Sequence, residues 1–268
     1  MITIKSQRFD KGIDTLSKVG GLDFDRPLTI LEQTAPDLAR LTVEFCYGEI
    51  ISRLELDLPT RQLCTVAALA AMANAQPQLR YHIAGALNVG CTPDAVTEVM
   101  LLCAVFAGFP AAENGVAAAK EIFDLQEGGF QPVSFTPTGD RYARGFSAVE
   151  KLSAGAGKSV TQSLRAISPD LSRFVVEFSY GDVLSRNVID NRTKELAIIA
   201  MLTAMGTASP QLKVHISAAL NVGVTEGEII EVIQQMAIYA GFPAALNGVF
   251  AAQAVFSEAA AEAEQNRQ

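Results

Sequence analysis

The chain contains two histidines, His82 and His215, and both lie in similar apolar surroundings. Each follows a Gln-Leu-Arg or Gln-Leu-Lys segment and precedes an isoleucine. An imidazole titrates near neutral pH, which suits it to proton transfer. The alternative is a core histidine satisfied by a neighbouring carbonyl, although a neutral imidazole is a costly way to fill an apolar site. The repeated placement keeps an acid–base role open for both residues.

A carboxylate lies within reach of one histidine. Glu195 opens one expected helix, and His215 lies midway along the next, antiparallel helix. At a rise of ~1.5 Å per residue the two positions differ in height by about 5–7 Å, which a glutamate side chain can largely close. Glu195 could therefore orient and polarise His215; the alternative is a helix-start glutamate that interacts with the helix dipole. Gln62 occupies the matching place before His82, so His82 has no such charge partner.

Two further side chains are candidates for substrate contact. Tyr180 and Arg186 have counterparts in Tyr47 and Arg53. An arginine at a helix end usually complements the helix dipole. Together with a histidine, it could instead bind a carboxylate through two hydrogen bonds.

The cysteines provide no shared redox or zinc chemistry. No two of them have CxxC spacing, so neither a zinc knuckle nor a thioredoxin-like pair is present. Their places in the second half of the chain are held by Ser, Ala, Val and Met, so we expect small core residues. The four are Cys46, Cys64, Cys91 and Cys103, and the matching positions are Ser179, Ala197, Val224 and Met236.

These correspondences arise because the chain consists of two tandem copies of one sequence unit. Residues 77–90 (PQLRYHIAGALNVG) align with residues 210–223 (PQLKVHISAALNVG) without a gap. About half of the aligned positions are identical over the central part of each copy, and such a long period indicates a duplicated domain rather than a solenoid. We predict two domains, 1–128 and 136–268, joined by an extended linker at 126–138.

Each copy is expected to be helical. Residues 63–75 and 196–205 are rich in Ala, Leu and Met and apolar on nearly every face, which predicts helices buried all round. We expect the next helix of each copy to open after Pro77 or Pro210. Thr92 and Thr225 should cap the following helices, and a last helix is expected at 111–124. Strand-like alternation is absent, so the predicted fold is all-α, with about six helices per copy.

Composition excludes several classes of function. The 268 residues carry a formal net charge of −8, whereas a nucleic-acid binder normally needs a basic face. The N-terminal segment lacks the apolar stretch of a signal peptide, and no run of 18 apolar residues occurs, so we expect neither a signal peptide nor a membrane span. We therefore expect a cytoplasmic protein with reduced thiols. The acidic balance still allows a small anionic substrate, because a local arginine or histidine can dominate its own pocket.

The second copy resembles the carboxymuconolactone decarboxylase family. The resemblance rests on Lys194-Glu195-Leu196, on residues 210–223, on Thr225 and Glu228, and on residues 235–247. The first copy shows the same pattern with substitutions, among them Gln62. The resemblance implies an all-helical domain that assembles into rings of six, so a tandem chain would form a homotrimer that is a pseudo-hexamer.

The resemblance also implies a reaction. The namesake enzymes remove CO₂ from 4-carboxymuconolactone in aromatic catabolism and use no cofactor. His215 would be the proton donor and Glu195 its orienting partner. From side-chain chemistry, Arg186 could hold a carboxylate and Tyr180 could donate a hydrogen bond to the lactone oxygen. No cofactor or metal site is expected.

Alternatives remain open at this level. A sister branch resembles AhpD-like alkylhydroperoxidases, whose CxxC positions hold Ala208 and Gln211 before His215, so thiol peroxidase activity is not expected. A related acid–base enzyme on another small oxo acid or lactone, or a non-catalytic oligomeric binding protein, is also compatible with the sequence. We expect the second copy to carry any catalysis while the first, with His82, builds the ring. Sites formed between the copies are the other possibility.

Overall fold

The computed structural model describes residues 6–126, 129–135, 137–153 and 157–265. Every regular element in these ranges is helical, and the predicted all-α tandem fold is confirmed. Residues 1–5 of the first predicted copy, and residues 127, 128 and 136 of the predicted linker, lie outside the described part. The domain boundaries at 128 and 136 therefore stay a prediction.

The first copy runs from α1 to α7 and includes a π-helical segment, η2, that continues α3 without a break. Its elements are α1 (Gln7–Gly20), η1 (Gly21–Asp23), α2 (Arg26–Thr34), α3 (Pro36–Leu41), η2 (Thr42–Ile51), α4 (Leu58–Met72), α5 (Gln76–Asn88), α6 (Pro93–Phe106) and α7 (Phe109–Phe123).

The second copy repeats this order from α8 to α14. Most of its elements begin and end 133 residues after their counterparts, and the last helix is longer. They are α8 (Arg141–Ser153), α9 (Gly157–Ile167), α10 (Pro169–Phe174), the π-helical η3 (Val175–Leu184), α11 (Asn191–Met205), α12 (Ser209–Asn221), α13 (Glu226–Tyr239) and α14 (Phe242–Gln265).

Local chemistry explains where these helices begin. The Thr92 side chain accepts a hydrogen bond from the Ala95 amide, and Thr225 forms a capping box with Glu228, as predicted. The last helix of the first copy begins at Phe109, two residues before the expected start. Prolines are tolerated in a first helical turn because the amide they lack has no partner there. Pro110 therefore lies inside α7.

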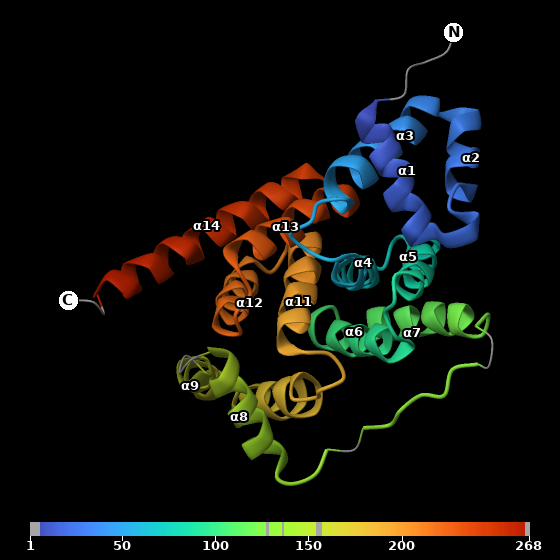
Figure 1. The fold of residues 1–268 in the computed structure, drawn as a ribbon. Coiled ribbons are helices and arrows are strands. Elements are labelled where there is room, and N and C mark those ends of the chain that lie inside the picture. Colours follow the sequence, from blue (N-terminus) through green and yellow to red (C-terminus); the bar gives the residue numbers. More distant parts are fainter. Residues whose placement is uncertain (1–5, 127–128, 136, 154–156, 266–268) are drawn as a thin grey trace.

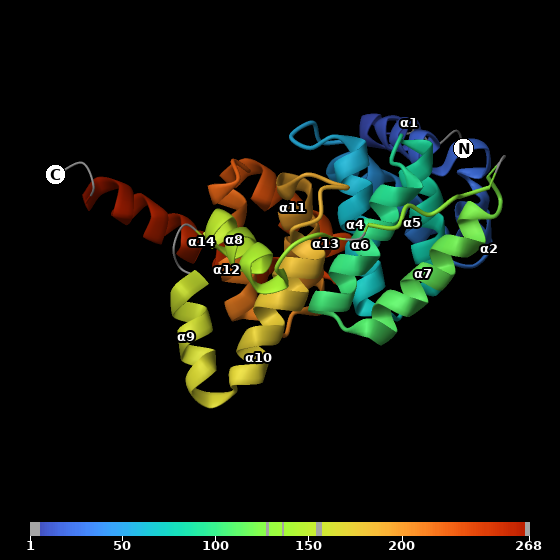
Figure 2. The ribbon, with the colours of Figure 1, turned by 90° about the horizontal axis from the view of Figure 1, so that it is seen from below.

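Helices α4 and α11 pack against each other at the centre of the molecule (Figure 1). The residues from 61 to 70 in α4 and from 194 to 204 in α11 are buried without interruption, as the apolar pattern predicts. One hydrophobic core extends from these helices into both copies. The initial helices of the two copies, α1–α3 and α8–α10, lie at opposite ends of the molecule (Figures 1 and 2).

Buried ion pairs join the two copies beside this central contact. The guanidinium of Arg61, fully buried in α4, donates to Glu231 Oε2 of α13 at 2.8 Å. Arg53 also donates to Glu231, at 2.7 Å. The equivalent pair on the other side is Arg186 with Glu98 of α6, at 2.9 Å. Each copy therefore supplies cations to a buried carboxylate of the other.

The outer surface keeps several large apolar side chains exposed, among them the equivalent pair Phe109 and Phe242, at 56% and 60%. The expected trimer would cover such residues, and it stays a prediction. Among the described residues, none of the helices has the length and apolar character needed to cross a membrane.

The buried ion pair gives a first testable prediction. Arg61→Gln should lower the free energy of unfolding by about 3 kcal/mol, because it leaves a buried carboxylate with fewer donors. Arg80→Gln is the matched control, since Arg80 binds Glu121 in an exposed pair and should leave the denaturation midpoint unchanged. Equal midpoints for the two variants in urea would contradict the role given to Arg61.

Candidate active site

Glu195 and His215 form a buried acid–base pair. His215 Nδ1 lies 2.7 Å from Glu195 Oε2, as the spacing of the two residues along adjacent helices suggested. Glu195 is completely buried and His215 is 6% exposed. Glu195 lies beyond the first turn of α11, where Asp190 provides the N-cap. The geometry therefore favours the histidine partner over the helix dipole.

This contact determines which nitrogen of His215 is available for chemistry. The carboxylate is an acceptor, so Nδ1–H donates to Glu195 and Nε2 is left for a ligand. The second oxygen of Glu195 is buried and has no hydrogen-bond partner. A carboxylate in this position fixes the orientation and the tautomer of the imidazole ring. The pair is therefore arranged to deliver or accept a proton at Nε2.

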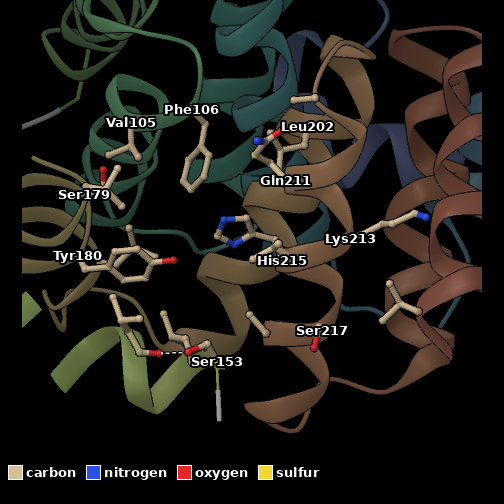
Figure 3. Close-up of a pocket in the computed structure, with 18 of the residues that line it drawn as sticks. Val105, Phe106, Ser153, Ser179, Tyr180, Leu202, Gln211, Lys213, His215 and Ser217 are labelled. Atoms are coloured by element: carbon tan, nitrogen blue, oxygen red, sulfur yellow. Dashed lines mark hydrogen bonds between the residues drawn. The ribbon is translucent and has the colours of Figure 1, made fainter. Parts of the chain in front are cut away.

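His215 lines a cavity of about 710 Å³ (Figure 3). The walls come from α6, α8, α9, η3, α11, α12 and α14, so both copies contribute. Asn221 of α12 helps to position α8 at this site, because its side-chain amide donates to the Leu152 carbonyl at 2.9 Å. The histidine pair is thus connected to a space large enough for a small molecule.

Tyr180 lies across the cavity from His215, and its hydroxyl points toward the imidazole (Figure 3). Burial, together with the negative charge of Glu195, raises the pKa of Tyr180 to about 12. The phenol therefore stays protonated near neutral pH and can donate a hydrogen bond. The structure thus brings together three of the predicted site residues, namely Glu195, His215 and Tyr180.

Phe106 completes the wall behind His215, and it belongs to the other copy. Its ring meets the imidazole edge-on, with ring centroids 4.9 Å apart. Tyr239 occupies the equivalent position and meets His82 in the same way at 5.3 Å. Sequence reasoning missed these residues. The signal was present, because both aligned positions are aromatic, but their contact partners lie in the opposite copy.

The structure does not bring Arg186 together with His215. Arg186 lies just beyond the end of η3, outside the residues that line the cavity. Its guanidinium binds Glu98 and lies over the Phe135 ring, 4.9 Å from the centroid. This arrangement leaves it connecting the copies rather than facing a ligand in the cavity.

The equivalent site around His82 has a different character. His82 Nδ1 lies 2.9 Å from the Gln62 amide oxygen, so a neutral group replaces the carboxylate. Tyr81 and Tyr239 both meet the His82 ring edge-on. Burial lowers the pKa of His82 to about 3. His82 is therefore neutral at physiological pH and has no charged partner.

Two substitutions change the space beside the histidine in the second copy. Tyr81 is replaced by Val214, and Gly20 is replaced by Ser153. In the first copy the Tyr81 hydroxyl approaches Gly20 so closely that an added Cβ would lie 2.6 Å from it. The valine at 214 does not extend so far, and Val214 and Ser153 both line the cavity instead. The tyrosine of the first copy thus occupies space next to Gly20 that Val214 does not fill in the second copy.

Comparison with known proteins agrees with this duplicated helical unit. The model of the carboxymuconolactone decarboxylase family matches the chain twice, over residues 36–121 and 169–254. The chain belongs to the carboxymuconolactone decarboxylase family. Each match lies within one of the two predicted copies.

Individual relatives support the family at modest identity. The chain is 33% identical over 118 residues to 4-carboxymuconolactone decarboxylase from Acinetobacter baylyi, a match that covers 44% of this chain and 87% of that protein. It is 32% identical over 98 residues to an uncharacterised 15.0 kDa protein from Paracoccus denitrificans, covering 36% of this chain and 73% of that protein.

A solved structure shares the fold over nearly the whole chain. It is assigned as a gamma-carboxymuconolactone decarboxylase subunit from Burkholderia xenovorans LB400. The TM-score is 0.55 at 23% sequence identity, with 95% of this chain and 99% of that chain covered. At this sequence identity the similarity supports a shared fold and nothing beyond it.

The thiols of this family member lie away from the cavity. Ala208 and Gln211, the two positions that precede His215 in the CxxC comparison above, do line it. Burial raises the pKa of Cys46, Cys91 and Cys103 to about 11 and that of Cys64 to about 12. Such thiols are poor nucleophiles at neutral pH. Within the described ranges, no group of three or more His, Cys, Asp or Glu side chains is placed to hold a metal ion.

The low pKa of His82 predicts a pH dependence of stability. The unfolded chain protonates this residue below about pH 6.5, whereas the folded chain resists protonation until about pH 3. Stability should therefore fall as the pH drops through this window, by up to about 1.4 kcal/mol per pH unit. His82→Gln should flatten the dependence of the melting temperature between pH 6.5 and 4. An unchanged slope in this variant would refute the assignment.

The two substitutions beside His215 predict how to narrow the cavity. The double variant Val214→Tyr, Ser153→Gly reproduces the filled arrangement of the first copy. It should fold with a melting temperature close to that of the wild type while narrowing the part of the cavity beside α8, because the same pair is accommodated in the first copy. A crystal structure of the variant tests this directly. A tyrosine at 214 that pointed into solvent and left the cavity open would contradict the explanation.

Proposed function

We propose that this chain is a cofactor-free lyase that decarboxylates a carboxylated lactone or a related oxo acid at the His215 site. The observation that supports this most strongly is the buried Glu195–His215 pair. Nδ1 of His215 is bound to Glu195, Nε2 is left for a ligand, and His215 lines the cavity. Family membership and the name of the Acinetobacter relative are consistent with this chemistry.

The reaction follows from the groups present. The bond between the substrate and its carboxylate carbon breaks, CO₂ leaves, and the electron pair passes into the unsaturated lactone or oxo group. Tyr180, a protonated phenol, donates a hydrogen bond to the oxygen on which charge develops. His215 then delivers the proton on Nε2 to the carbon of the resulting enolate, and Glu195 stabilises the imidazolium before this transfer.

The same argument assigns different roles to the two copies. His82 has an amide in place of a carboxylate, and Tyr81 and Tyr239 surround its ring. We therefore place catalysis in the second copy. The first copy provides Phe106 and Val105 to the wall of that site.

The proposal is tested by assaying purified protein with 4-carboxymuconolactone and following CO₂ release without added cofactor. His215→Ala should lower kcat by about 10²–10⁴-fold, since general acid catalysis contributes that much. Glu195→Gln should lower kcat with a smaller change in KM, and His82→Gln should retain turnover. Loss of turnover in His82→Gln with retention in His215→Ala would reverse the assignment, and absence of turnover in the folded wild type would remove this substrate.

A further inference from the structure

The cavity at His215 is larger than a small carboxylated lactone requires. Its volume of about 710 Å³ falls in the range of roughly 300–1,000 Å³ found for drug-sized ligands. A compact lactone at the Nε2 atom of His215 would leave much of this volume unfilled. Apolar contacts with a ligand contribute binding free energy. The chemical character of the unfilled part therefore indicates which class of substrate the site would bind.

Most of this remaining space has apolar walls. Phe106, Leu152, Leu164, Leu184 and Val255 line it, and they come from five different elements, α6, α8, α9, η3 and α14. Uncharged polar groups are few, and those of Ser153, Ser179 and Gln211 are among them. A ligand body that fills this space would therefore exchange water for apolar contact on several sides.

The charges that line the cavity are unsuited to a substrate with several carboxylates. Arg186, the guanidinium predicted to hold one, is occupied by Glu98. Among the described residues that line the cavity, Lys213 is the only cation, and Figure 3 shows its side chain directed away from His215. Glu258 and Glu262 on α14 line the outer part and would repel additional anionic groups.

A single carboxylate next to His215 would fit this environment as the group that leaves. Apart from the His215 imidazolium, whose charge is matched by Glu195, no cation faces this position, so a carboxylate in these apolar surroundings is poorly solvated. When the carboxylate leaves as neutral CO₂, the electron pair of the broken bond carries the negative charge into the conjugated system. Tyr180 can donate a hydrogen bond to the oxygen on which this charge develops. The same surroundings would penalise a second carboxylate that is not lost.

We propose that this site takes a monocarboxylic lactone or oxo acid with a bulky alkyl or aryl body, larger and more apolar than 4-carboxymuconolactone. The inference rests on the proposed function for the identity of the reacting end. The apolar body occupies the space between α8, α9, η3 and α14, and the neutral lactone or ketone produced after CO₂ loss remains complementary to the same walls.

Inert γ-lactones with methyl, butyl and octyl side chains test this class, because they resemble such products and need no turnover. Calorimetric titration of the full chain should give dissociation constants that fall at least tenfold at each step, since a buried methylene contributes up to about fourfold. 4-Carboxymuconolactone, titrated into the His215→Ala variant to prevent turnover, should bind more weakly than the butyl lactone. Affinity that does not change with chain length, or tighter binding of the dicarboxylate, would overturn the inference.

Two variants connect the effect to this cavity. Val214→Tyr, Ser153→Gly should reduce the gain from methyl to octyl, because the tyrosine occupies part of the space beside α8. Ala259→Trp, at an exposed position on α14 that lines the outer cavity, should weaken the octyl lactone while leaving the methyl lactone unchanged. Normal chain-length dependence in both variants would place the lactones elsewhere. If the lactones show the expected chain-length dependence but the protein releases CO₂ from no substrate tested, the proposed function is wrong and the ligand class still stands.

Discussion

The packing of α4 on α11 is the contact on which the rest of the molecule depends. Both helices are buried on every side, so neither copy can bury its own central helix without the other. This contact carries Glu195 into the centre of the protein and brings α6 and α13 across to the opposite copy. The aromatic residues behind each histidine, Phe106 and Tyr239, are placed by this arrangement. The candidate site is thus a product of the interface between copies.

Within one backbone plan the two sites differ through a small number of side chains. A carboxylate replaces an amide beside the histidine, and a valine replaces the tyrosine that occupies the neighbouring space. The first change supplies charge to the imidazole, and the second supplies room for a ligand. Because both occur in the same copy, the histidine with the carboxylate partner is also the histidine that lines the cavity.

Sequence alone predicted the features that depend on neighbours along the chain. The repeat predicted that the helices follow one another in the same order in both copies. The separation of Glu195 and His215 on consecutive helices predicted their contact. The partner of Arg186 was not predictable, because Glu98 lies in the other copy and nothing in local spacing relates the two. The same holds for Phe106. The closing effect of Tyr81 also required the structure, because it depends on the close approach of α5 to Gly20.

Joining the copies in one chain has a consequence for how such a site can change. In a homodimer of single copies, any substitution appears twice, so opening one pocket opens both and weakening one wall weakens both. Here the two halves vary independently while they keep the same interface. One half can hold a tightly filled, neutral centre that stabilises the assembly, and the other can tolerate a hollow and a buried charge. Covalent duplication therefore permits an asymmetry that a symmetric dimer forbids.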